Sequence, residues 1–382
     1  MTTSMKVVTA ISLALAIVGC ESQPNRSPTP SPSAGAVRVD TVARGLSHPW
    51  GLAILPDGRF LVTERSGSLR LIERDGHMSA PLPGVPRVAA TGQGGLLDVT
   101  LDREFDRNRT IYLSFAEPGD NNSAGTAVAR ARLGDAGLDS VRVIYRQEPK
   151  VAGGGHFGSR VVANRDGTLF ITQGDRFSYR ERAQDLMSGL GKVVRVRTDG
   201  TIPRDNPFAG RSDARKEIWS YGHRNVQAAA LDASGRLWTI EHGAAGGDEL
   251  NHPEGGKNYG WPVITYGKDY DGRRIGEGTE KAGMEQPVYY WDPVIAPSGM
   301  VVYAGDAFSS WKGNILVGGL ASRVLVRLVL EDGVVAREER YLGEVKERIR
   351  DVQEGRDGLI YVVTDEDDGK LLRISPNATS PR

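Results

Sequence analysis

A histidine that follows three glycines is the residue of this chain best suited to chemistry. The segment reads Gly153-Gly154-Gly155-His156, and consecutive glycines suit a backbone that lines a cavity better than one that packs a core. Asp175 comes one predicted hairpin later, so adjacent strand ends would bring its carboxylate beside the imidazole. A carboxylate there orients the ring and raises its basicity, as a general base requires. A single histidine is also often structural, and on this evidence alone both interpretations stay open.

Further polar residues stand close to other predicted hairpins. Gln93 lies in a glycine-rich segment and can both donate and accept a hydrogen bond. Arg224 offers a planar fork for carboxylate or quinone oxygens, and Asn225 beside it adds a neutral donor. Arg348 and Arg350 are two positions apart, so in a strand both face one side and together need an anion. Taken alone, each of these motifs also fits a turn or a solvated surface.

One loop has the ligand chemistry of calcium. Residues 241–251 read EHGAAGGDELN, which combines accessible backbone carbonyls with carboxylates, the hard oxygen donors that calcium takes. Their spacing does not match an EF-hand loop. We find no dinucleotide-binding glycine pattern, no phosphate-binding loop, no G-x-S-x-G motif and no zinc-type His or Cys cluster in the sequence. The remaining set of arginines, amides, aromatics, calcium-like loop and His–Asp pair fits a planar anionic cofactor beside a proton acceptor.

Repeated hairpins are the elements that must position these residues. Strand-like segments with apolar alternation flank tight turns at residues 52–64, 160–175, 229–243 and 351–366, with looser copies at 97–115 and 300–319. The turns recur at intervals of roughly 45 to 80 residues, which suits four-stranded blades with loop insertions. We therefore predict an all-β fold, a six-bladed β-propeller of four-stranded antiparallel blades, with residues 37–44 closing the last blade. A two-domain β-sandwich is the alternative, and the lack of a composition break disfavours it.

The N-terminus predicts export. Lys6 precedes an apolar run that is too short to span a bilayer, and residues 1–19 read as a signal peptide. Cys20 is the only cysteine among 382 residues, and the segment ending in it resembles a lipobox. We expect a periplasmic lipoprotein held at the outer membrane through lipid on Cys20, with a soluble secreted protein as the alternative. Residues 20–36 form a Pro/Ser-rich tether, residues 37–376 the propeller and residues 377–382 a tail.

Charge and cysteine content exclude some classes of protein. Lys plus Arg number 48 and Asp plus Glu number 48, so the basic excess typical of nucleic-acid-binding proteins is missing. We expect no nucleic-acid partner. With one cysteine the chain can form no internal disulfide, so core packing and sheet hydrogen bonds must hold the fold.

Five segments, HFGSR, GHRN-x-Q, EHG-x-x-GGDELN, NYGWP and RIRDV, occur in this order. They resemble the soluble aldose sugar dehydrogenases that use pyrroloquinoline quinone (PQQ), relatives of the soluble quinoprotein glucose dehydrogenases, over about Leu46 to Ser375. The resemblance implies a six-bladed propeller with PQQ and calcium at the channel mouth, His156 as catalytic base and Asp175 as the carboxylate behind it. The positions that it assigns to the cofactor are Gln93, Arg224, Asn225, His242, Tyr270, Leu320, Ala321, Arg348 and Arg350. Backbone carbonyls of Gly243 and Ala244 match ligands of the PQQ calcium, and Glu249 and Tyr259 match ligands of a structural calcium.

The resemblance also implies a reaction. His156 takes the proton of the anomeric hydroxyl of an aldose while hydride leaves C1 for PQQ, calcium acts as Lewis acid, and the lactone is the product. An unidentified acceptor then takes the electrons. Ala321 stands where glucose dehydrogenase relatives have a lysine on the cofactor, and His242 where they have a glutamine, which leaves cofactor affinity and substrate range open. The shorter loop around NYGWP favours a monomer.

Two other function classes share the fold. One is a calcium-dependent propeller hydrolase such as a lactonase, which would have no use for arginines that converge on an anion. The other is a non-catalytic propeller that binds a glycan or a protein partner. It predicts no PQQ binding and no effect of His156 on any turnover.

Overall fold

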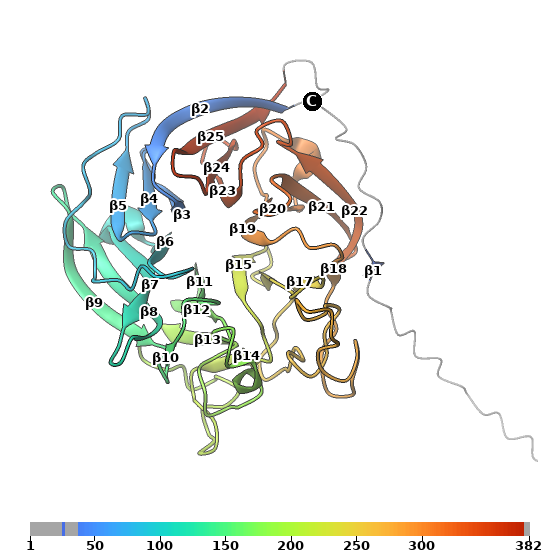
Figure 1. Cartoon of the computed structure of the whole chain (residues 1–382). Coiled ribbons are helices and arrows are strands. Elements are labelled where there is room, and N and C mark those ends of the chain that lie inside the picture. The colour runs from blue at the N-terminus through green and yellow to red at the C-terminus, as the bar shows by residue number, and fades with distance from the viewer. Residues whose placement is uncertain (1–24, 27–36, 378–382) are drawn as a thin grey trace, which may run out of the picture.

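Six antiparallel blades surround a central axis in this chain (Figure 1). The computed structural model describes residues 25–26 and 37–377, and it confirms the predicted six-bladed propeller. From the inside outward, blade 1 has β3 (Pro49–Ile54), β4 (Phe60–Glu64) and β5 (Ser68–Ile72), and blade 2 has β6 (Leu96–Leu101), β7 (Thr110–Pro118), β8 (Ser123–Leu133) and β9 (Leu138–Arg146). In the same order, blade 3 has β11 (Gly158–Ala163), β12 (Thr168–Gln173), β13 (Lys192–Arg197) and β14 (Ile218–Tyr221), and blade 4 has β15 (Val226–Leu231), β16 (Leu237–Glu241), β17 (Asp248–Asn251) and β18 (Tyr289–Trp291). Blade 5 has β19 (Pro297–Val302), β20 (Ile315–Gly319), β21 (Leu325–Glu331) and β22 (Val334–Tyr341), and blade 6 has β23 (Ile349–Glu354), β24 (Ile360–Thr364), β25 (Gly369–Pro376) and β2 (Val37–Leu46).

A few short elements complete the described chain. In blade 1 the fourth place is taken by an irregular segment, where Ser79 N donates to Leu71 O and Leu82 N donates to Leu69 O. The other elements are β10 (Val151–Ala152) beside β8, β1 (Asn25–Arg26) parallel to β18, α1 (Phe105–Asn108), and the 3-10 helices η1 (Arg180–Ala183) and η2 (Ser309–Trp311). Within the described ranges no helix is long and apolar enough to cross a membrane. The predicted signal peptide and Cys20 lie outside the described residues.

The N-terminal strand closes the ring, as the sequence predicts. β2 pairs with β25 from Val37 opposite Pro376 to Leu46 opposite Gly369, and the two strands lie side by side at the top of Figure 1. Blade 6 is thereby built from both ends of the folded chain. Because the ring is closed, every blade packs against a neighbour on both faces, and few sheet edges are exposed.

Tight turns join the first two strands of most blades. Gly167 in the β11–β12 turn has φ +76°, and a Cβ there would meet no atom within 4 Å, so the left-handed backbone, not lack of space, selects glycine. In blades 2 and 5 the connection is longer and contains α1 and η2. These two insertions account for the looser hairpin signal at residues 97–115 and 300–319.

Each innermost strand has a register shift at the same end. In β11 it falls between Gly158 and Val161, in β23 between Ile349 and Asp351, and β3, β6, β15 and β19 have equivalent shifts. A bulge of this kind bends the strand and re-aims its side chains. In β11 the bulged end directly follows the loop that contains His156. The bulged ends of the six inner strands therefore shape the rim where the candidate site lies.

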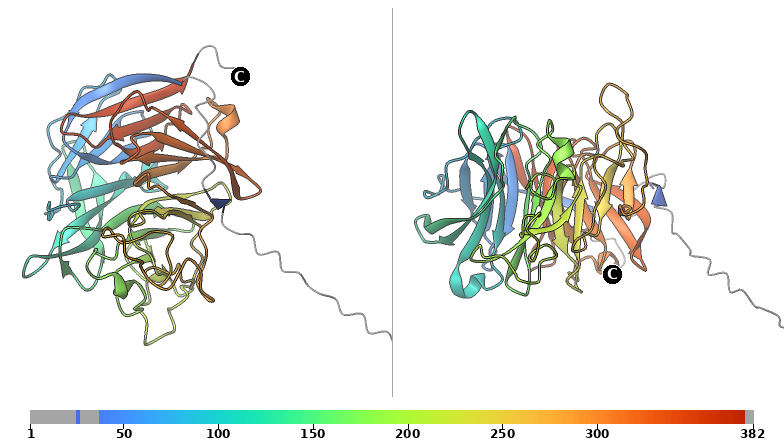
Figure 2. Two further views of the ribbon diagram at one scale, coloured as in Figure 1. Left: turned by 45° about the vertical axis from the view of Figure 1, so that its right-hand side comes forward. Right: turned by 90° about the horizontal axis from the view of Figure 1, so that it is seen from below.

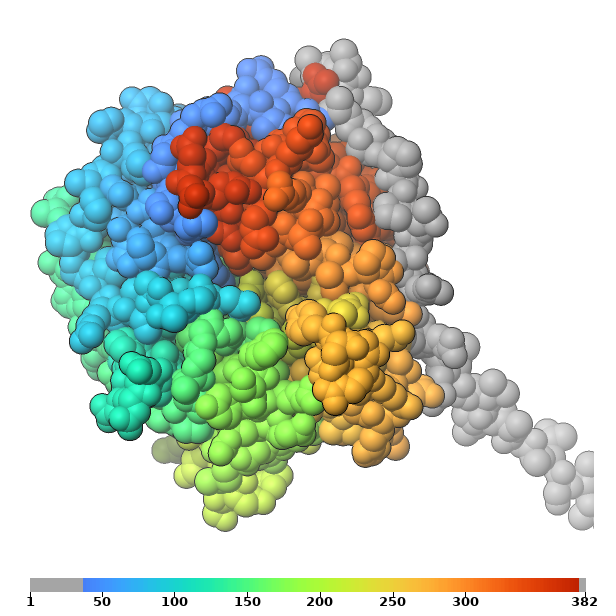
Figure 3. All heavy atoms as spheres, viewed as in Figure 1, coloured from blue at the N-terminus to red at the C-terminus, as the bar shows by residue number. Residues whose placement is uncertain are grey.

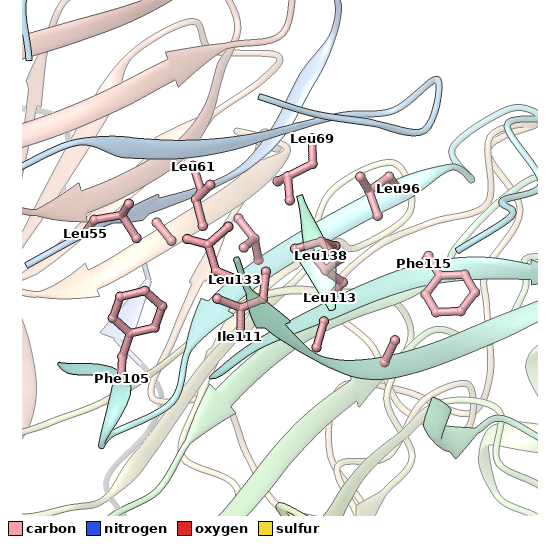
Figure 4. Packing of buried hydrophobic residues seen from close by; sticks show 14 of the residues in the cluster. Leu55, Leu61, Leu69, Leu96, Phe105, Ile111, Leu113, Phe115, Leu133 and Leu138 are labelled. Carbon is pink, nitrogen blue, oxygen red and sulfur yellow. The ribbon is translucent and has the colours of Figure 1, made fainter. Parts of the chain in front are cut away.

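Apolar side chains fill the wedges between neighbouring blades. Leu61 of blade 1 and Ile111 and Leu113 of blade 2 belong to one such cluster and have no exposed surface (Figure 4). Burial of each side chain of this size contributes about 1.5–3 kcal/mol. Similar clusters join the other blades, which makes the ring a rigid support for loops at its rim.

A buried ion triad lies on the innermost strands. Arg160 Nη1 is 2.7 Å from Asp98 Oδ1 and 3.1 Å from Asp351 Oδ2. Asp351 also accepts a hydrogen bond from Leu52 N at 2.8 Å, and the Arg160 guanidinium lies 4.5 Å from the centre of the Trp50 ring. Blades 1, 2, 3 and 6 are thus connected through desolvated charges, an arrangement that is sensitive to loss of either partner.

Candidate active site

The structure brings His156 and Asp175 together as the sequence predicts. His156 precedes β11 and Asp175 follows β12, and the pairing of Gly158 with Gln173 aligns the two loops. His156 Nδ1 is 2.7 Å from Asp175 Oδ1. Because a carboxylate only accepts, Nδ1 carries the ring proton. Nε2 makes no hydrogen bond within the described part of the chain, so it is the nitrogen that a substrate can reach.

Asp175 is itself fixed from two blades. Its Oδ2 accepts a hydrogen bond from Trp261 Nε1 at 2.7 Å, and its Oδ1 accepts one from Phe177 N at 2.7 Å. Its backbone N donates to Arg224 O at 2.8 Å. Trp261 belongs to the long connection between β17 and β18 of blade 4. Blade 4 therefore holds the His156–Asp175 pair of blade 3 in place. In the sequence this tryptophan is named only as part of the NYGWP segment, without a role of its own.

The environment favours the neutral form of His156. Burial is the largest cause that lowers the pKa of His156, the charge of Arg224 lowers it further, and Asp175 acts in the opposite direction. A histidine whose pKa lies below the ordinary value is unprotonated near neutral pH. The ring can therefore accept a proton under those conditions.

A buried arginine holds the glycine loop in front of His156. Arg176 is 1% exposed, and its guanidinium donates to Gly155 O at 2.9 Å, to Ala124 O at 2.5 Å and to Gly153 O. It also lies 3.7 Å from the centre of the Phe157 ring. The side chain has no acidic partner within residues 37–377, and burial lowers the pKa of Arg176 to about 10. Nothing in the local sequence marks this residue, because its role depends on carbonyls of two other segments.

Arg224 faces His156 from blade 4. Its Nη1 donates to the carbonyl of Gly243, and its Nη2 lies 3.3 Å from the hydroxyl of Tyr270. Its Nε is buried and has no hydrogen-bond partner in the described structure. Asn225 instead supports the backbone, since its Oδ1 accepts a hydrogen bond from Gly158 N at 3.1 Å.

Arg348 and Arg350 point at one place, as their spacing predicts. Their Nη2 atoms lie 3.2 Å and 2.9 Å from Asp365 Oδ2, and His48 Nδ1 lies 3.1 Å from the other oxygen. Although burial opposes it, Arg350 holds the pKa of Asp365 well below its usual range. Asp365 thus supplies part of the negative charge that the arginine pair needs. Sequence reasoning missed this carboxylate because it follows the neighbouring strand, β24.

Arg65 is a further cation that sequence reasoning missed. It follows β4, and its Nη1 donates to Gly92 O at 2.9 Å. Its Nε is buried without a partner, and no acidic side chain of the described residues pairs with it. Next to it, Gln93 Oε1 accepts a hydrogen bond from His156 N at 2.9 Å. Arg350 Nη1 donates to Gln227 Oε1 at 2.9 Å.

Two cavities collect these residues, and the hydrogen bond from His156 N to Gln93 Oε1 connects their walls. The first, of about 350 Å³, is bordered by three arginines together with glutamine and aromatic side chains. The second, of about 310 Å³, is lined by His156 and Asp175. Of the predicted cofactor positions, the first cavity has Gln93, His242, Leu320, Arg348 and Arg350, and the second has Arg224 and Tyr270. Asn225 and Ala321 border neither, and Ala321 is exposed.

The segments that surround the cavities come from distant parts of the chain. In Figure 3 the connection between β17 and β18 (gold), the segment near residue 90 (cyan) and the segment near residue 175 (green) lie next to one another on this face. The gold connection also projects beyond the disc in the right-hand view of Figure 2. With its three arginines, the first cavity suits an anion. The second cavity contains the proton acceptor, His156.

The loop between β16 and β17 is tightly fixed. Gly243 N donates to Asp248 Oδ1 at 2.8 Å, and Asp248 Oδ2 accepts hydrogen bonds from Ile295 N at 2.8 Å and Ala296 N at 2.9 Å. Ala244 borders the second cavity. His242 Nε2 donates to a backbone carbonyl at 2.6 Å, and burial lowers the pKa of His242 to about 3, with a smaller contribution from Arg224. The histidine is therefore a neutral donor.

Two carboxylates, one buried and one half-buried, lie behind this loop. Glu241 and Glu249 are opposite one another on β16 and β17 and border a cavity of about 10 Å³, which Tyr259 also lines. Burial, and then Glu241, raise the pKa of Glu249 above its ordinary value. The hydroxyl of Tyr259 donates to His252 O at 2.6 Å. The described residues contain no group of three or more His, Cys, Asp or Glu side chains placed to hold a metal, so an ion here needs backbone oxygens as well.

Comparison with known proteins identifies the family. The family model described as glucose/sorbosone dehydrogenase matches residues 46–373, nearly the whole propeller. The chain belongs to the glucose/sorbosone dehydrogenase family. This result confirms the resemblance predicted from the five ordered segments.

Individual proteins also match the chain over most of its length. Aldose sugar dehydrogenase YliI of Escherichia coli (strain K12) is 46% identical over 346 residues, which cover 89% of this chain and 93% of that protein. The crystal structure of the soluble aldose sugar dehydrogenase from Escherichia coli in the apo-form superposes with a TM-score of 0.87 at 45% identity, covering 90% of this chain and 100% of that one. The PQQ-bound form of aldose sugar dehydrogenase from Streptomyces coelicolor has a TM-score of 0.75 at 28% identity, covering 91% and 100%.

Proposed function

We propose that this chain oxidises aldose sugars at C1 to the lactone, with PQQ as oxidant, calcium beside it and His156 as general base. The observation that carries the proposal is the His156–Asp175 pair in the second cavity, where His156 N donates to Gln93, a residue of the arginine-rich first cavity. Membership of the glucose/sorbosone dehydrogenase family and the PQQ-bound relative support it.

The first cavity has the donor chemistry for PQQ, which has three carboxylates and a quinone. Arg65, Arg348 and Arg350 border it, and the acidic side chains of its wall are Asp365 and Glu366, so positive charge is in excess. The Nε atoms of Arg224 and Arg350 are buried without partners in the described structure, which leaves donors for a bound anion. When bound, PQQ supplies the two-electron acceptor for the hydride that leaves sugar C1.

Two sets of oxygens suit calcium. The carbonyls of Gly243 and Ala244 would hold an ion beside the cofactor, although the Gly243 carbonyl also accepts a hydrogen bond from Arg224. A second ion would lie between Glu241 and Glu249, whose carboxylates border a space of about 10 Å³, about the size of one bound ion or water.

The residues of this chain define the path of the proton. Asp175 accepts a hydrogen bond from the protonated Nδ1 of His156, which leaves Nε2 without a proton. Nε2 then takes the proton of the anomeric hydroxyl as the C1–H bond breaks, so that C1 becomes a carbonyl and the ring a lactone. Asp175 stabilises the imidazolium that forms, and Trp261 keeps the carboxylate in place. Arg224 borders the same cavity as His156 and would stabilise negative charge on the substrate oxygen.

The lowered pKa of His156 predicts the pH dependence of turnover. The base works while it is neutral, so activity is lost as the pH falls through the folded-state pKa. Because burial and Arg224 lower that pKa, kcat/KM for an aldose is expected to fall only below the ordinary histidine value of about 6.5. A dye-coupled pH profile in the acid range measures the position of this limb. An acid limb at or above the ordinary value contradicts the assignment of the base.

A titration of the apo-protein with PQQ and calcium tests the proposal. Wild type is expected to bind one PQQ and then to reduce a dye with aldoses. Arg348→Gln is expected to bind PQQ about tenfold more weakly, because one charge-assisted hydrogen bond is lost. Arg356→Gln is the matched control, since Arg356 is exposed at the other end of the same blade. If wild type binds no PQQ, or if both variants bind as wild type does, the proposed cofactor site is wrong.

A further inference from the structure

We propose that Phe177 is the platform of the sugar-binding subsite, and that it stacks on the apolar face of a pyranose whose hydroxyl groups are equatorial. Tyr270 borders the same cavity, and the ion pair between Arg180 and Asp269 supplies the hydrogen bonds of the subsite. This inference rests on the proposed function and names the substrate class of the same site.

Two exposed aromatic rings stand at the mouth of the cavity that contains His156. Phe177 is 53% exposed and Tyr270 is 64% exposed, and they are the only aromatic side chains among the exposed large hydrophobics of the described residues. Their ring centres are 6.4 Å apart at an interplanar angle of 22°, and the Phe177 ring lies 5.1 Å from the imidazole of His156. Exposed aromatic surface beside a proton acceptor indicates a site for a ligand with an apolar face.

The backbone holds Phe177 in this place against its own preference. Arg176 has φ +60° and Phe177 has φ +63°, and two consecutive bulky residues in the left-handed region are unfavourable. The buried guanidinium of Arg176 and the hydrogen bond from Phe177 N to Asp175 Oδ1 maintain this conformation. A conformation that is imposed by its surroundings and that exposes an aromatic ring over the catalytic pair is typical of a functional position.

A polar pair completes the rim of the same cavity. Arg180 Nη1 of η1 lies 3.1 Å from Asp269 Oδ2, and both side chains are partly exposed. A carboxylate can accept hydrogen bonds from neighbouring hydroxyls, and a guanidinium can donate to them.

This combination of rim groups selects a shape of sugar. When the hydroxyls of a pyranose are equatorial, they point to the ring edge and leave the axial hydrogens as a flat apolar face. Such a sugar can place its face on Phe177 and its edge on the polar pair, while an axial hydroxyl on the stacked face would separate the rings.

Binding of 1,5-anhydro-D-glucitol is the direct test, because this pyranose has no anomeric hydroxyl and cannot be oxidised at C1. Its Kd is measured by calorimetry on the PQQ- and calcium-loaded protein, and on the apo-protein if PQQ does not load. For Phe177→Ala we expect a Kd about tenfold higher than for wild type, and a similar rise in the KM for D-glucose with a smaller change in kcat. For Phe177→Tyr we expect values within about twofold of wild type, since the ring remains.

The controls separate this proposal from the proposed function. Met187→Ala removes another exposed apolar side chain, 57% exposed, from the same connection between β12 and β13, and is expected to bind like wild type. The Kd for PQQ is expected to be unchanged in Phe177→Ala. The subsite is wrong if wild type does not bind the anhydro sugar, if Phe177→Ala binds it normally, if Met187→Ala loses as much affinity, or if PQQ binding weakens as much as sugar binding. Failure of the proposed function appears separately, as a wild type that binds no PQQ and oxidises no aldose.

Discussion

Replacement of His156 by alanine is expected to lower kcat for aldose oxidation by about 1000-fold, because a positioned general base contributes about 100- to 10,000-fold. The physical reason is that Nε2 is the one nitrogen of the His156–Asp175 pair left for a substrate, while Nδ1 is committed to the carboxylate. Binding of PQQ is expected to change little, since the imidazole borders the second cavity and not the arginine-rich one. Steady-state kinetics and a PQQ titration of the same preparation measure both quantities.

A second histidine in the molecule shows what distinguishes His156. His223 Nδ1 also faces a carboxylate, Glu241 Oε1 at 2.9 Å, but its Nε2 is bound to Ser220 Oγ at 2.8 Å. Both nitrogens of His223 are therefore occupied, and its role is structural. His77→Ala is the control for the kinetics, because His77 is exposed on the outer side of blade 1. Turnover in His156→Ala within tenfold of wild type would remove the histidine from the mechanism.

Replacement of Asp351 by alanine is expected to lower the free energy of unfolding by about 3–5 kcal/mol. The substitution leaves the buried guanidinium of Arg160 with Asp98 alone and removes the acceptor of Leu52 N. The lost contacts connect blades 1, 3 and 6, and the buried guanidinium cannot replace the lost carboxylate with water. Urea unfolding of the apo-protein, followed by tryptophan fluorescence, measures the change.

The control for this stability prediction is Asp306→Ala. Asp306 also pairs with a cation, Lys312, at 2.9 Å, but its side chain is 94% exposed. Such a pair contributes about 0–1 kcal/mol because water screens it. Equal destabilisation by the two substitutions, or a loss below about 1 kcal/mol for Asp351→Ala, would show that the triad does not stabilise the propeller.

The parts of this molecule that could be predicted from sequence are those with a local cause. Apolar alternation around Asp-Gly turns identifies the hairpins, and one hairpin is enough to bring Asp175 to His156. The spacing of Arg348 and Arg350 likewise predicts that they share a target, and both reach Asp365. The ring closure by β2 follows from an unpaired strand at the N-terminal end of the propeller.

The parts that could not be predicted depend on contacts between segments distant in the chain. Trp261 reaches Asp175 across 86 positions, and Arg176 finds its carbonyl partners only after the glycine loop has folded beside β8. Arg65 has no sequence signal beyond its charge. The conformation that exposes Phe177 is a left-handed backbone that phenylalanine does not favour, so no propensity rule would place it over the base.

The most direct test of the proposed reaction is a single turnover with an aldose deuterated at C1. The PQQ- and calcium-loaded protein is mixed with the sugar in the absence of oxygen and dye, and the product is analysed by mass spectrometry while the absorbance of the bound quinone is followed. We expect one equivalent of lactone without deuterium for each bound PQQ, with slower quinone reduction than for the protiated sugar. Product that retains deuterium, or a quinone spectrum that does not change on addition of any aldose, would contradict oxidation at C1 by this chain.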